Sequence, residues 1–597
     1  MKKNWKLKDL TPWKSSSCGE IGLFDDKELN LLRQELSGLK TNSNLPEVIV
    51  KLLYMRGVCD FSGVQRFFYS STEHSKTNLQ WLHDPFLMKD CKEACDRVIT
   101  AINNGEKIMV LGDYDVDGTC GVSLFYLFLK ELGTEPEIYI PDRITEGYGI
   151  SNEAVDSAES QGIKLIVAID CGITAYERVE YAKQKGIEFI ICDHHQPPDE
   201  IPDALAVIDV HRKDDEYPYK DLCGTGVAYK LATAVAIKLG KPDLTNKYLD
   251  LVAVATASDI VPMTDENRIL VKEGLKLLNT SPRNSITRLI ELSGLESKNI
   301  TTSNIVFTLA PRINAVGRMG DAKRAVLLLT SEDKETINEY AKVLQGVNEE
   351  RREVDKNITD DAFKMFEESD DFENGNSIVI YNKDWHPGVV GIVAARLVEK
   401  YNLPSIVLTE VNGYAKGSAR SINAFNIYDA LKQCNDSLRQ FGGHFHAAGL
   451  ELEVDKIEEF KKQFNDIATK GLTDEQLEPV IEVDAEIKIS ELDDRMIKIL
   501  NYFEPYGPGN MAPVFVTKDL QIVGEVRKAK ANTHIFRVME PDTKKFFECV
   551  FFNSAAYSED IISGKYCDIC YSVDRNFWNG REYVKLRIRD MRSYTLS

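Results

Sequence analysis

Short strand-like runs alternate with longer segments of helical spacing over residues 101–330. A continuous apolar run is typical of a strand that is buried on both faces of its sheet. Each run is followed by a segment that suits a helix, and this alternation predicts a parallel sheet flanked by helices. The strand-like runs are residues 108–111, 136–141, 164–169 and 188–192.

The pattern changes along the chain and divides it into five parts. We expect a helical amino-terminal segment over residues 1–100 and the parallel-sheet domain over 101–330. Residues 331–374 have apolar positions spaced by three and four among many charges, which predicts one or two long connecting helices. A second α/β domain follows over 375–475. Short strands separated by regularly spaced turn residues predict a small β-barrel over 476–597.

Composition limits the class of protein. The chain has 597 residues, with 43% hydrophobic and 28% charged residues, so several folded cores are expected and a disordered protein is not. The net charge of −21 argues against a protein that coats nucleic acid, but it allows an enzyme that takes a strand end into a local basic cleft. No run approaches the ~20 apolar residues of a membrane helix, and no signal peptide is evident. With its scattered cysteines, the chain is expected to be cytoplasmic.

Acidic and imidazole side chains follow the apolar runs. Asp113, Asp115 and Asp117 stand on alternate residues after the first run. In an open parallel sheet the carboxyl ends of the strands line the ligand crevice. We therefore expect a set of side chains from distant segments to converge there and to bind metal. The predicted ligands are Asp115, Asp117, Asp170, His194 and Asp259.

The predicted ligands are mostly oxygen atoms, with one imidazole among them. Such a set favours Mn²⁺ or Mg²⁺, and it contains enough carboxylates to bridge two divalent ions. An acidic turn without metal is the alternative, although three neighbouring aspartates repel one another unless a positive charge lies among them. A calcium loop would also need the closing Glu of the twelve-residue motif, which is missing.

Arginine, hydroxyl and glycine residues form candidate phosphate contacts. Arg143 lies in a glycine-containing loop after a strand, and a guanidinium binds phosphate in a bidentate way. Residues 310–320 bring Arg312, Asn314 and Arg318 together beside a glycine. Surface loops, helix caps and tight turns are the structural alternatives. In the second α/β domain the predicted substrate contacts are Ser418, Arg420, Ser421, Gly443 and His444.

The barrel region carries candidate nucleic-acid contacts. Residues 527–530 form a basic strip, and Tyr506, Phe536 and Trp578 are candidate platforms on which bases stack. Core packing is the alternative for each of these aromatic side chains.

Three motifs carry a family resemblance. Asp-Tyr-Asp-Val-Asp-Gly at residues 113–118, Asp-Cys-Gly-Ile-Thr at 170–174 and Asp-His-His at 193–195 resemble the DHH phosphoesterase superfamily. Within it, the chain is most similar to the RecJ family of bacterial exonucleases. The segments at 416–421 and 441–449 resemble the DHHA1 domain, and Glu-Pro-Tyr-Gly-Pro-Gly-Asn at 504–510 resembles the RecJ OB-fold. The implied fold is a DHH domain, a DHHA1 domain joined to it by a long helix, and a carboxyl-terminal OB-type barrel.

This resemblance implies a function and roles for individual residues. The expected activity is a metal-dependent exonuclease that degrades single-stranded DNA in the 5′→3′ direction to mononucleotides, in DNA repair and recombination. His195, Asp113 and Arg312 would be catalytic. The resemblance also implies cooperation with a helicase and a single-strand-binding protein, and we expect a monomer. Many DHH relatives carry a histidine where this chain has Leu111, whereas RecJ-like relatives have an apolar residue there, so the coordination of one ion stays open.

Two other functions fit part of the pattern. DHH–DHHA1 phosphodiesterases that act on short oligonucleotides or cyclic dinucleotides share the metal residues, but they lack the barrel and the amino-terminal extension. A non-catalytic scaffold would also fit the fold, but the full set of acids argues against it.

Overall fold

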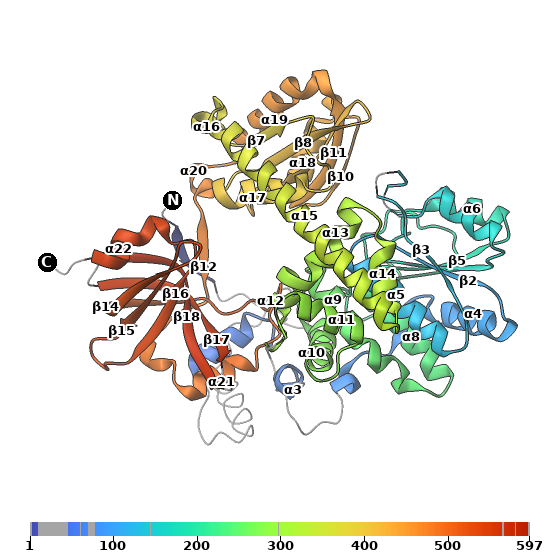
Figure 1. Ribbon diagram of the computed structural model, residues 1–597, viewed down its shortest axis with the longest axis horizontal. Helices are drawn as coiled ribbons and strands as arrows, with labels where there is room; N and C mark the ends of the chain where they lie inside the picture. Colours follow the sequence, from blue (N-terminus) through green and yellow to red (C-terminus); the bar gives the residue numbers. More distant parts are fainter. Residues whose placement is uncertain are drawn as a thin grey trace. The chain divides into compact units, whose positions relative to one another are not determined.

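The structure is a computed structural model (Figure 1). It describes residues 3–9, 46–59, 61–69, 78–143, 145–147, 149–296, 298–563, 566–578 and 581–594. The chain forms two compact units. The larger unit comprises Trp5–Gly317, Asp321–Lys342 and Glu482–Ser597, and the smaller unit comprises Met1–Asn4, Arg318–Gly320 and Val343–Ile481.

The larger unit contains a five-stranded, all-parallel sheet in the order β3-β2-β4-β5-β6. Its strands β2 and β4 are buried along their whole length, which explains their uninterrupted apolar sequences. The chain leaves β2 toward β3 and returns to β4 on the other side, so the strand order reverses between β2 and β4. Ligand sites of open α/β sheets lie at such a reversal. The strands are β2 (Ile108–Gly112), β3 (Glu137–Tyr139), β4 (Leu165–Ile169), β5 (Glu188–Asp193) and β6 (Ala206–Asp209).

Helices surround this sheet and pack against it. Buried residues run almost continuously through α5, α8 and α9, which is why these helices lack a clear polar face. The helices before and between the strands are α4 (Cys91–Asn104), α5 (Val116–Glu131), α6 (Asn152–Ser160) and α7 (Tyr176–Gln184). After the sheet come α8 (Gly224–Lys238), α9 (Leu249–Ser258), α10 (Asp265–Thr280), α11 (Asn284–Leu292) and α12 (Thr302–Asn304). A π-helix, η4 (Ile305–Leu309), then leads into α13 (Ala310–Met319) and α14 (Lys323–Thr330). Short 3₁₀ turns are η1 (Asn78–Trp81), η2 (Pro85–Leu87) and η3 (Pro242–Tyr248).

The carboxyl-terminal part of the larger unit is the predicted β-barrel. Its strand order is β13-β14-β15-β16-β18-β17, and pairing of β14 with β17 closes the barrel. The strands are β13 (Ala485–Glu486), β14 (Phe515–Ala529), β15 (Thr533–Met539), β16 (Phe546–Phe551), β17 (Tyr566–Trp578) and β18 (Arg581–Tyr594). The accompanying short helices are η7 (Ile489–Glu491), α21 (Asp494–Asn501), η8 (Ala555–Tyr557) and α22 (Ser558–Ser563).

Within the described amino-terminal residues, α2 (Glu47–Tyr54) and α3 (Phe61–Tyr69) share the hydrophobic core of the barrel. Leu53 and Phe68 belong to the same buried cluster as Phe515 of β14. The rings of Phe68 and Phe503 meet edge to face, with centroids 5.7 Å apart. The helical character of this region agrees with the sequence pattern, but its packing partner lies more than four hundred residues further along the chain.

The smaller unit is the second predicted α/β domain. Its sheet has the order β10-β11-β9-β8-β7, and only β7 and β8 run parallel. The predicted connection is a single helix, α15 (Lys334–Glu367). The strands are β7 (Ile378–Tyr381), β8 (Ser405–Val411), β9 (Tyr414–Arg420), β10 (Gln440–Gly443) and β11 (Ala447–Glu453). The other elements are α16 (Asp371–Asn374), α17 (Val390–Tyr401), α18 (Ile427–Gln433), η5 (Asn435–Ser437), η6 (Val454–Lys456), α19 (Ile457–Gly471) and α20 (Asp474–Leu477).

The remaining short strands are β1 (Asn4–Leu7) and β12 (Val480–Val483). Among the residues that the structure describes, no helix has the length and apolar character needed to cross a membrane. The predicted α/β multidomain fold with a parallel-sheet domain, a second α/β domain and a barrel is confirmed.

Candidate metal-binding active site

The acidic turn after β2 is built around Gly118. Asp115 is the N-cap of α5, and its Oδ1 accepts a hydrogen bond from the Gly118 N–H at 3.1 Å. A Cβ at Gly118 would lie 2.4 Å from Asp113 O, so no other residue fits there. The turn therefore presents Asp113, Asp115 and Asp117 at the carboxyl end of β2, where the strand order reverses.

Hydrogen-bond donors at the start of α8 bind Asp117. Its two carboxylate oxygens accept hydrogen bonds from Gly224 N at 2.6 Å and Thr225 N at 2.8 Å, and Thr225 Oγ1 donates to Asp117 O at 2.7 Å. A Cβ at Gly224 would lie 2.5 Å from Asp170 Cβ. The glycine-containing start of this helix thus binds an anion, as such helix starts do, but the anion is a side chain of the protein itself.

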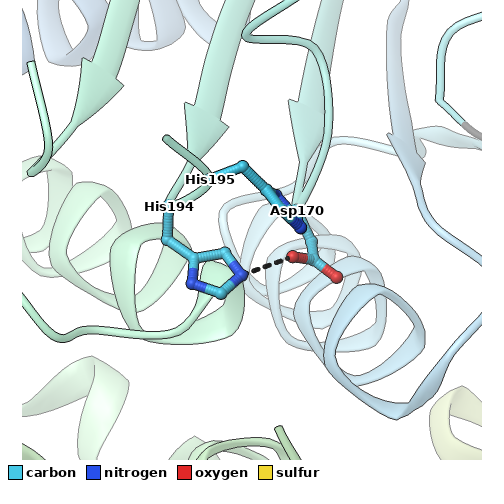
Figure 2. Close-up of side chains that lie close together, drawn as sticks. All are labelled: Asp170, His194 and His195. Atoms are coloured by element: carbon cyan, nitrogen blue, oxygen red, sulfur yellow. Dashed lines mark ion pairs between the residues drawn. The ribbon is translucent and has the colours of Figure 1, made fainter. Parts of the chain in front are cut away.

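Four of the five predicted ligands meet at the imidazole of His194, and Figure 2 shows its ion pair with Asp170. His194 Nε2 lies 3.1 Å from Asp170 Oδ1, 3.7 Å from Asp259 Oδ2 and 3.9 Å from Asp117 Oδ2. The fifth, Asp115, forms a second group with Asp113 and Asp170, whose ligand atoms all lie within 4.8 Å of one another. The sheet therefore brings together all five predicted ligands and Asp113.

Burial and mutual repulsion raise the pKa values of four carboxyl groups in this cluster. Burial is the main cause for Asp113, Asp115 and Asp170, and neighbouring aspartates add to it. The same causes raise the pKa of Asp259 to about 9. Positive charge placed among such carboxyl groups would favour their ionised form.

The donor set fits divalent metal ions. The Oδ1 atom of Asp113 and the Oδ2 atom of Asp259 are buried and accept no hydrogen bond. Carboxylate oxygens with one imidazole are ligands that suit Mn²⁺ and Mg²⁺. Leu111 is fully buried in the core on one side of the sheet, and its side chain offers no ligand atom.

Asp193 organises the His-His pair. Its Oδ1 accepts hydrogen bonds from the backbone of His194 (2.8 Å) and His195 (3.2 Å), and it lies 2.7 Å from His195 Nδ1. Although burial opposes both charges, the His195–Asp193 pair lowers the pKa of Asp193 to about 2 and raises that of His195 to about 9. The Asp-His-His motif contained Asp193, but sequence reasoning assigned it no role.

His211 was also missed by sequence reasoning. Its Nδ1 lies 2.6 Å from His194 O, a hydrogen bond in which the imidazole donates. Asp209, at the end of β6, accepts from His211 N at 2.7 Å. The sequence did contain a signal for this region, because Asp209 ends a parallel strand, as Asp193 does. The two aspartates are paired in register.

Two of the predicted phosphate contacts lie beside the acidic turn. The Arg143 guanidinium lies over the Tyr114 ring, 5.1 Å from its centroid, and its charge lowers the pKa of Asp113 against the effect of burial. Asn314 Oδ1 accepts a hydrogen bond from Val116 N at 3.0 Å, so this side chain supports the turn directly.

The other residues of α13 have mostly structural contacts. Arg312 is buried, and its Nη1 donates to Thr308 O at 2.5 Å. Arg318 lies in the last turn of α13, and its Nη1 donates to Gly388 O at 3.3 Å.

The candidate contacts of the smaller unit form a cluster on its sheet. Ser418 of β9 is paired with Gly449 of β11, and Gly449 with Gly442 of β10. A Cβ at Gly391, in the first turn of α17, would lie 3.1 Å from both Ser418 Oγ and Arg420 Nη2. Because these neighbouring residues are glycines, they leave space around the Ser418 and Arg420 side chains.

The remaining candidates of the smaller unit lie in the same strands and turns. Ser421 Oγ donates to Phe425 O at 2.6 Å. Gly443 has φ +151°, and a Cβ there would lie 2.4 Å from Ala447 O. His444 follows with an exposed side chain, and its N–H donates to Ala447 O at 2.8 Å.

The three candidate stacking platforms of the barrel differ in their surroundings. Phe536 follows the alternative of core packing: its ring is 1% exposed and packs in the barrel core. Strand alternation placed it inward, which the sequence did not reveal. Tyr506 is half-buried and its hydroxyl donates to Leu500 O. The side chain of Trp578 lies outside the described residues.

Family models match three parts of the chain. The DHH family N-terminal domain matches residues 107–256, the DHHA1 domain 374–470 and the RecJ OB domain 483–590. The fold and the acidic site thus define a DHH protein with an appended OB domain.

Comparison with curated relatives shows which family of DHH proteins the chain belongs to. The chain is 37% identical to the single-stranded-DNA-specific exonuclease RecJ of Bacillus subtilis, over 94% of this chain and 69% of that protein. It is 30% identical to the protein of the same name from Salmonella typhimurium, over 92% and 96%. The chain belongs to the RecJ family.

Solved structures agree with this assignment. A RecJ structure in complex with Mn²⁺ from Thermus thermophilus is similar with a TM-score of 0.78 and 26% identity, covering 96% of this chain and 79% of that one. A second exonuclease RecJ structure, bound to manganese, has a TM-score of 0.56 and 32% identity, covering 65% and 96%.

Proposed function

We propose that this protein is a metal-dependent exonuclease that degrades single-stranded DNA in the 5′→3′ direction to mononucleotides. The observation that carries the proposal is the meeting of five carboxylates and His194 where the strand order reverses. The relatives named single-stranded-DNA-specific exonucleases, which match over most of the chain, support the substrate.

We assign two divalent ions, Mn²⁺ or Mg²⁺, to this site. Asp115, Asp117, Asp170, His194 and Asp259 would hold them, and Asp113 would ligate or orient a ligand. Related structures in complex with Mn²⁺ and with Mg²⁺ support this choice. When bound, such ions supply an activated water and neutralise charge on the phosphate that is cleaved.

His195 is suited to a different role from that of its neighbour. Its Nδ1 is engaged by Asp193, so the protonated ring can donate from Nε2 to a phosphate oxygen or to the leaving group. A protonated imidazole has no lone pair to offer to a metal ion. Arg312, as a third catalytic residue, would add positive charge beside the reacting phosphate.

The remaining candidates would hold the strand. Ser418 and Arg420 of the smaller unit would bind the 5′-terminal phosphate through charge-assisted hydrogen bonds, and Arg143 of the larger unit is by itself suited to the same kind of phosphate contact. Asn314, Arg318, Ser421, Gly443 and His444 would contact the neighbouring backbone. We propose that the protein acts as a monomer in the cytoplasm, with a helicase and a single-strand-binding protein supplying the strand; the family resemblance supports these partners.

The family assignment disfavours the alternative, a phosphodiesterase of short oligonucleotides or cyclic dinucleotides. The RecJ OB domain matched at residues 483–590 is the feature that such an enzyme does not need.

Digestion of end-labelled DNA tests the proposal. Long single strands labelled at the 5′ or the 3′ end are incubated with the protein, with and without Mn²⁺, beside a duplex of the same sequence. We expect labelled mononucleotide to appear at once from the 5′ label and late from the 3′ label, only with metal and only from single strands. Cleavage confined to dinucleotides or short oligomers would contradict the proposal.

A further inference from the structure

The glycine-containing loop before the barrel, residues 504–511, is bonded to the segment that follows Asp259. Met263 N donates to Pro508 O at 2.6 Å, and Met263 is 1% exposed. Met263 lies four residues after Asp259, in the stretch between α9 and α10. A loop of the barrel region therefore contacts the stretch that begins at a proposed metal ligand.

Buried arginines fasten this loop to the rest of the larger unit. Arg268 Nη2, from α10, donates to Glu504 O at 3.0 Å. Arg56, just after α2, donates from Nε to Asn510 Oδ1 at 2.7 Å. Both ends of the loop are thus held by charge-assisted hydrogen bonds, so the loop is a firm support for Met263.

The stretch that the loop supports is strained. Ile260, the residue after Asp259, has φ +62°, which is an outlier for a β-branched side chain. Its side chain is 65% exposed, so burial does little to offset the strain. Such a conformation persists only where the surroundings impose it. The constraints lie downstream, at Pro262 O, which accepts from Asn267 Nδ2 at 3.0 Å, and at Met263.

The Asp259 carboxylate has little support of its own. Its Oδ2 is buried and accepts no hydrogen bond, and His194 Nε2 is 3.7 Å away. The backbone must therefore determine where this carboxylate lies.

We propose that the loop over residues 504–511 is a positioning element for the metal site: by holding Met263, it keeps Asp259 within reach of Asp117 and His194. This inference rests on the metal-dependent function proposed above. The barrel region then contributes to metal binding as well as to any contact with DNA.

Gly507→Ala tests the inference. A Cβ at Gly507 would lie 2.9 Å from Met263 Cβ and 3.1 Å from its Cε. The backbone of Gly507 is not in the left-handed region, so alanine is allowed there and Met263 must move instead. We expect Mn²⁺ affinity to fall about 10-fold, the scale seen when support of a ligand is lost. The measurement is Mn²⁺ titration of the full-length protein without DNA, followed by electron paramagnetic resonance of the free ion.

Two comparisons separate positioning from general damage. Gly346→Ala places a methyl group where nothing lies within 4 Å and should leave the affinity unchanged. Adding Ile260→Asn to Gly507→Ala should restore part of the affinity, because Asn adopts positive φ more readily and the strain that displaces Asp259 is reduced. Saturating Mn²⁺ should return the nuclease rate of Gly507→Ala to the wild-type level.

Wild-type Mn²⁺ affinity in a folded Gly507→Ala protein would overturn the inference, as would a loss that neither Ile260→Asn nor excess Mn²⁺ reverses. Should alanine prevent folding, Thr302→Val removes only the hydrogen bond that Tyr506 O accepts at 2.9 Å and is held to the same outcomes. Because the titration uses no DNA, a protein that binds Mn²⁺ but does not cleave DNA would refute the proposed function and leave this inference standing.

Discussion

The two candidate sites of this protein contain side chains of opposite chemical character. In the larger unit, carboxylates crowd together with their pKa values raised by burial, and two of their oxygens accept no hydrogen bond. In the smaller unit, Ser418 and Arg420 stand beside glycines on the strands of an open sheet. One cluster needs positive charge to be stable, whereas the other offers hydrogen-bond donors and positive charge. The first is suited to cations and the second to the phosphates of the substrate.

The difference also concerns how each site is held. The acidic cluster is fixed by backbone N–H groups, such as those of Gly224 and Thr225 on Asp117. The cluster of the smaller unit is fixed by strand register, with Ser418 opposite Gly449. A change in one should therefore leave the other intact, and four predictions test this separation.

The largest effect is expected at Asp170, which groups with Asp113 and Asp115 and also lies 3.1 Å from His194 Nε2. Asp170→Asn should reduce the rate of single-strand cleavage by about 1,000-fold, because several kcal/mol of metal-dependent stabilisation is lost. Single-stranded DNA binding, measured by fluorescence anisotropy, should stay near the wild-type level. Undiminished turnover in this variant would falsify the assignment of the active site.

Binding of Mn²⁺ should stabilise the larger unit alone. At a concentration about 100 times the dissociation constant, a bound ion adds about 2.7 kcal/mol to the free energy of unfolding. Hydrogen exchange followed by mass spectrometry should show protection around β2, β4 and α8 on adding Mn²⁺, and none on β9 to β11. Equal protection in both units, or the same response in Asp170→Asn, would contradict the separation.

Arg420→Gln should weaken binding of the substrate and leave binding of the metal unchanged. Loss of a charged donor to phosphate is expected to raise KM for 5′-phosphorylated single strands about 10- to 30-fold, with a smaller change in kcat. Strands with a 5′-hydroxyl provide the control, since they should show little difference between variant and wild type. Weaker Mn²⁺ binding in Arg420→Gln would show that the two sites are not independent.

The smallest effect is expected at Thr225. Thr225→Val removes the hydrogen bond that the backbone O of Asp117 accepts from Thr225 Oγ1 and retains the bond that Asp117 Oδ1 accepts from Thr225 N. A loss of about 1 kcal/mol corresponds to roughly fivefold weaker Mn²⁺ binding. Calorimetric titration would measure it, with Thr233→Val, in the same helix but bonded to Tyr229 O, as the matched control. An identical loss in both variants would point to the helix rather than to Asp117.

Much of the fold was predictable because local patterns determine it. Buried parallel strands such as β2 and β4 need continuous apolar sequences, and the small barrel needs turns at regular spacing. Packing between distant segments was not predictable. The helices α2 and α3 complete the barrel core, and Phe536 faces that core rather than solvent, because side-chain direction depends on register.

The sequence by itself determined which side chains stand at the carboxyl ends of the strands, and with them the metal chemistry, since the type of residue sets its ligand atoms. Only the tertiary structure decided which residues hold those ligands in place: Asp193 and His211 at the histidine pair, the start of α8 at Asp117, and the loop over 504–511 beside Met263. The reason is physical. A ligand atom is a property of one residue, whereas its support is a set of hydrogen bonds and contacts between segments that lie together only after folding.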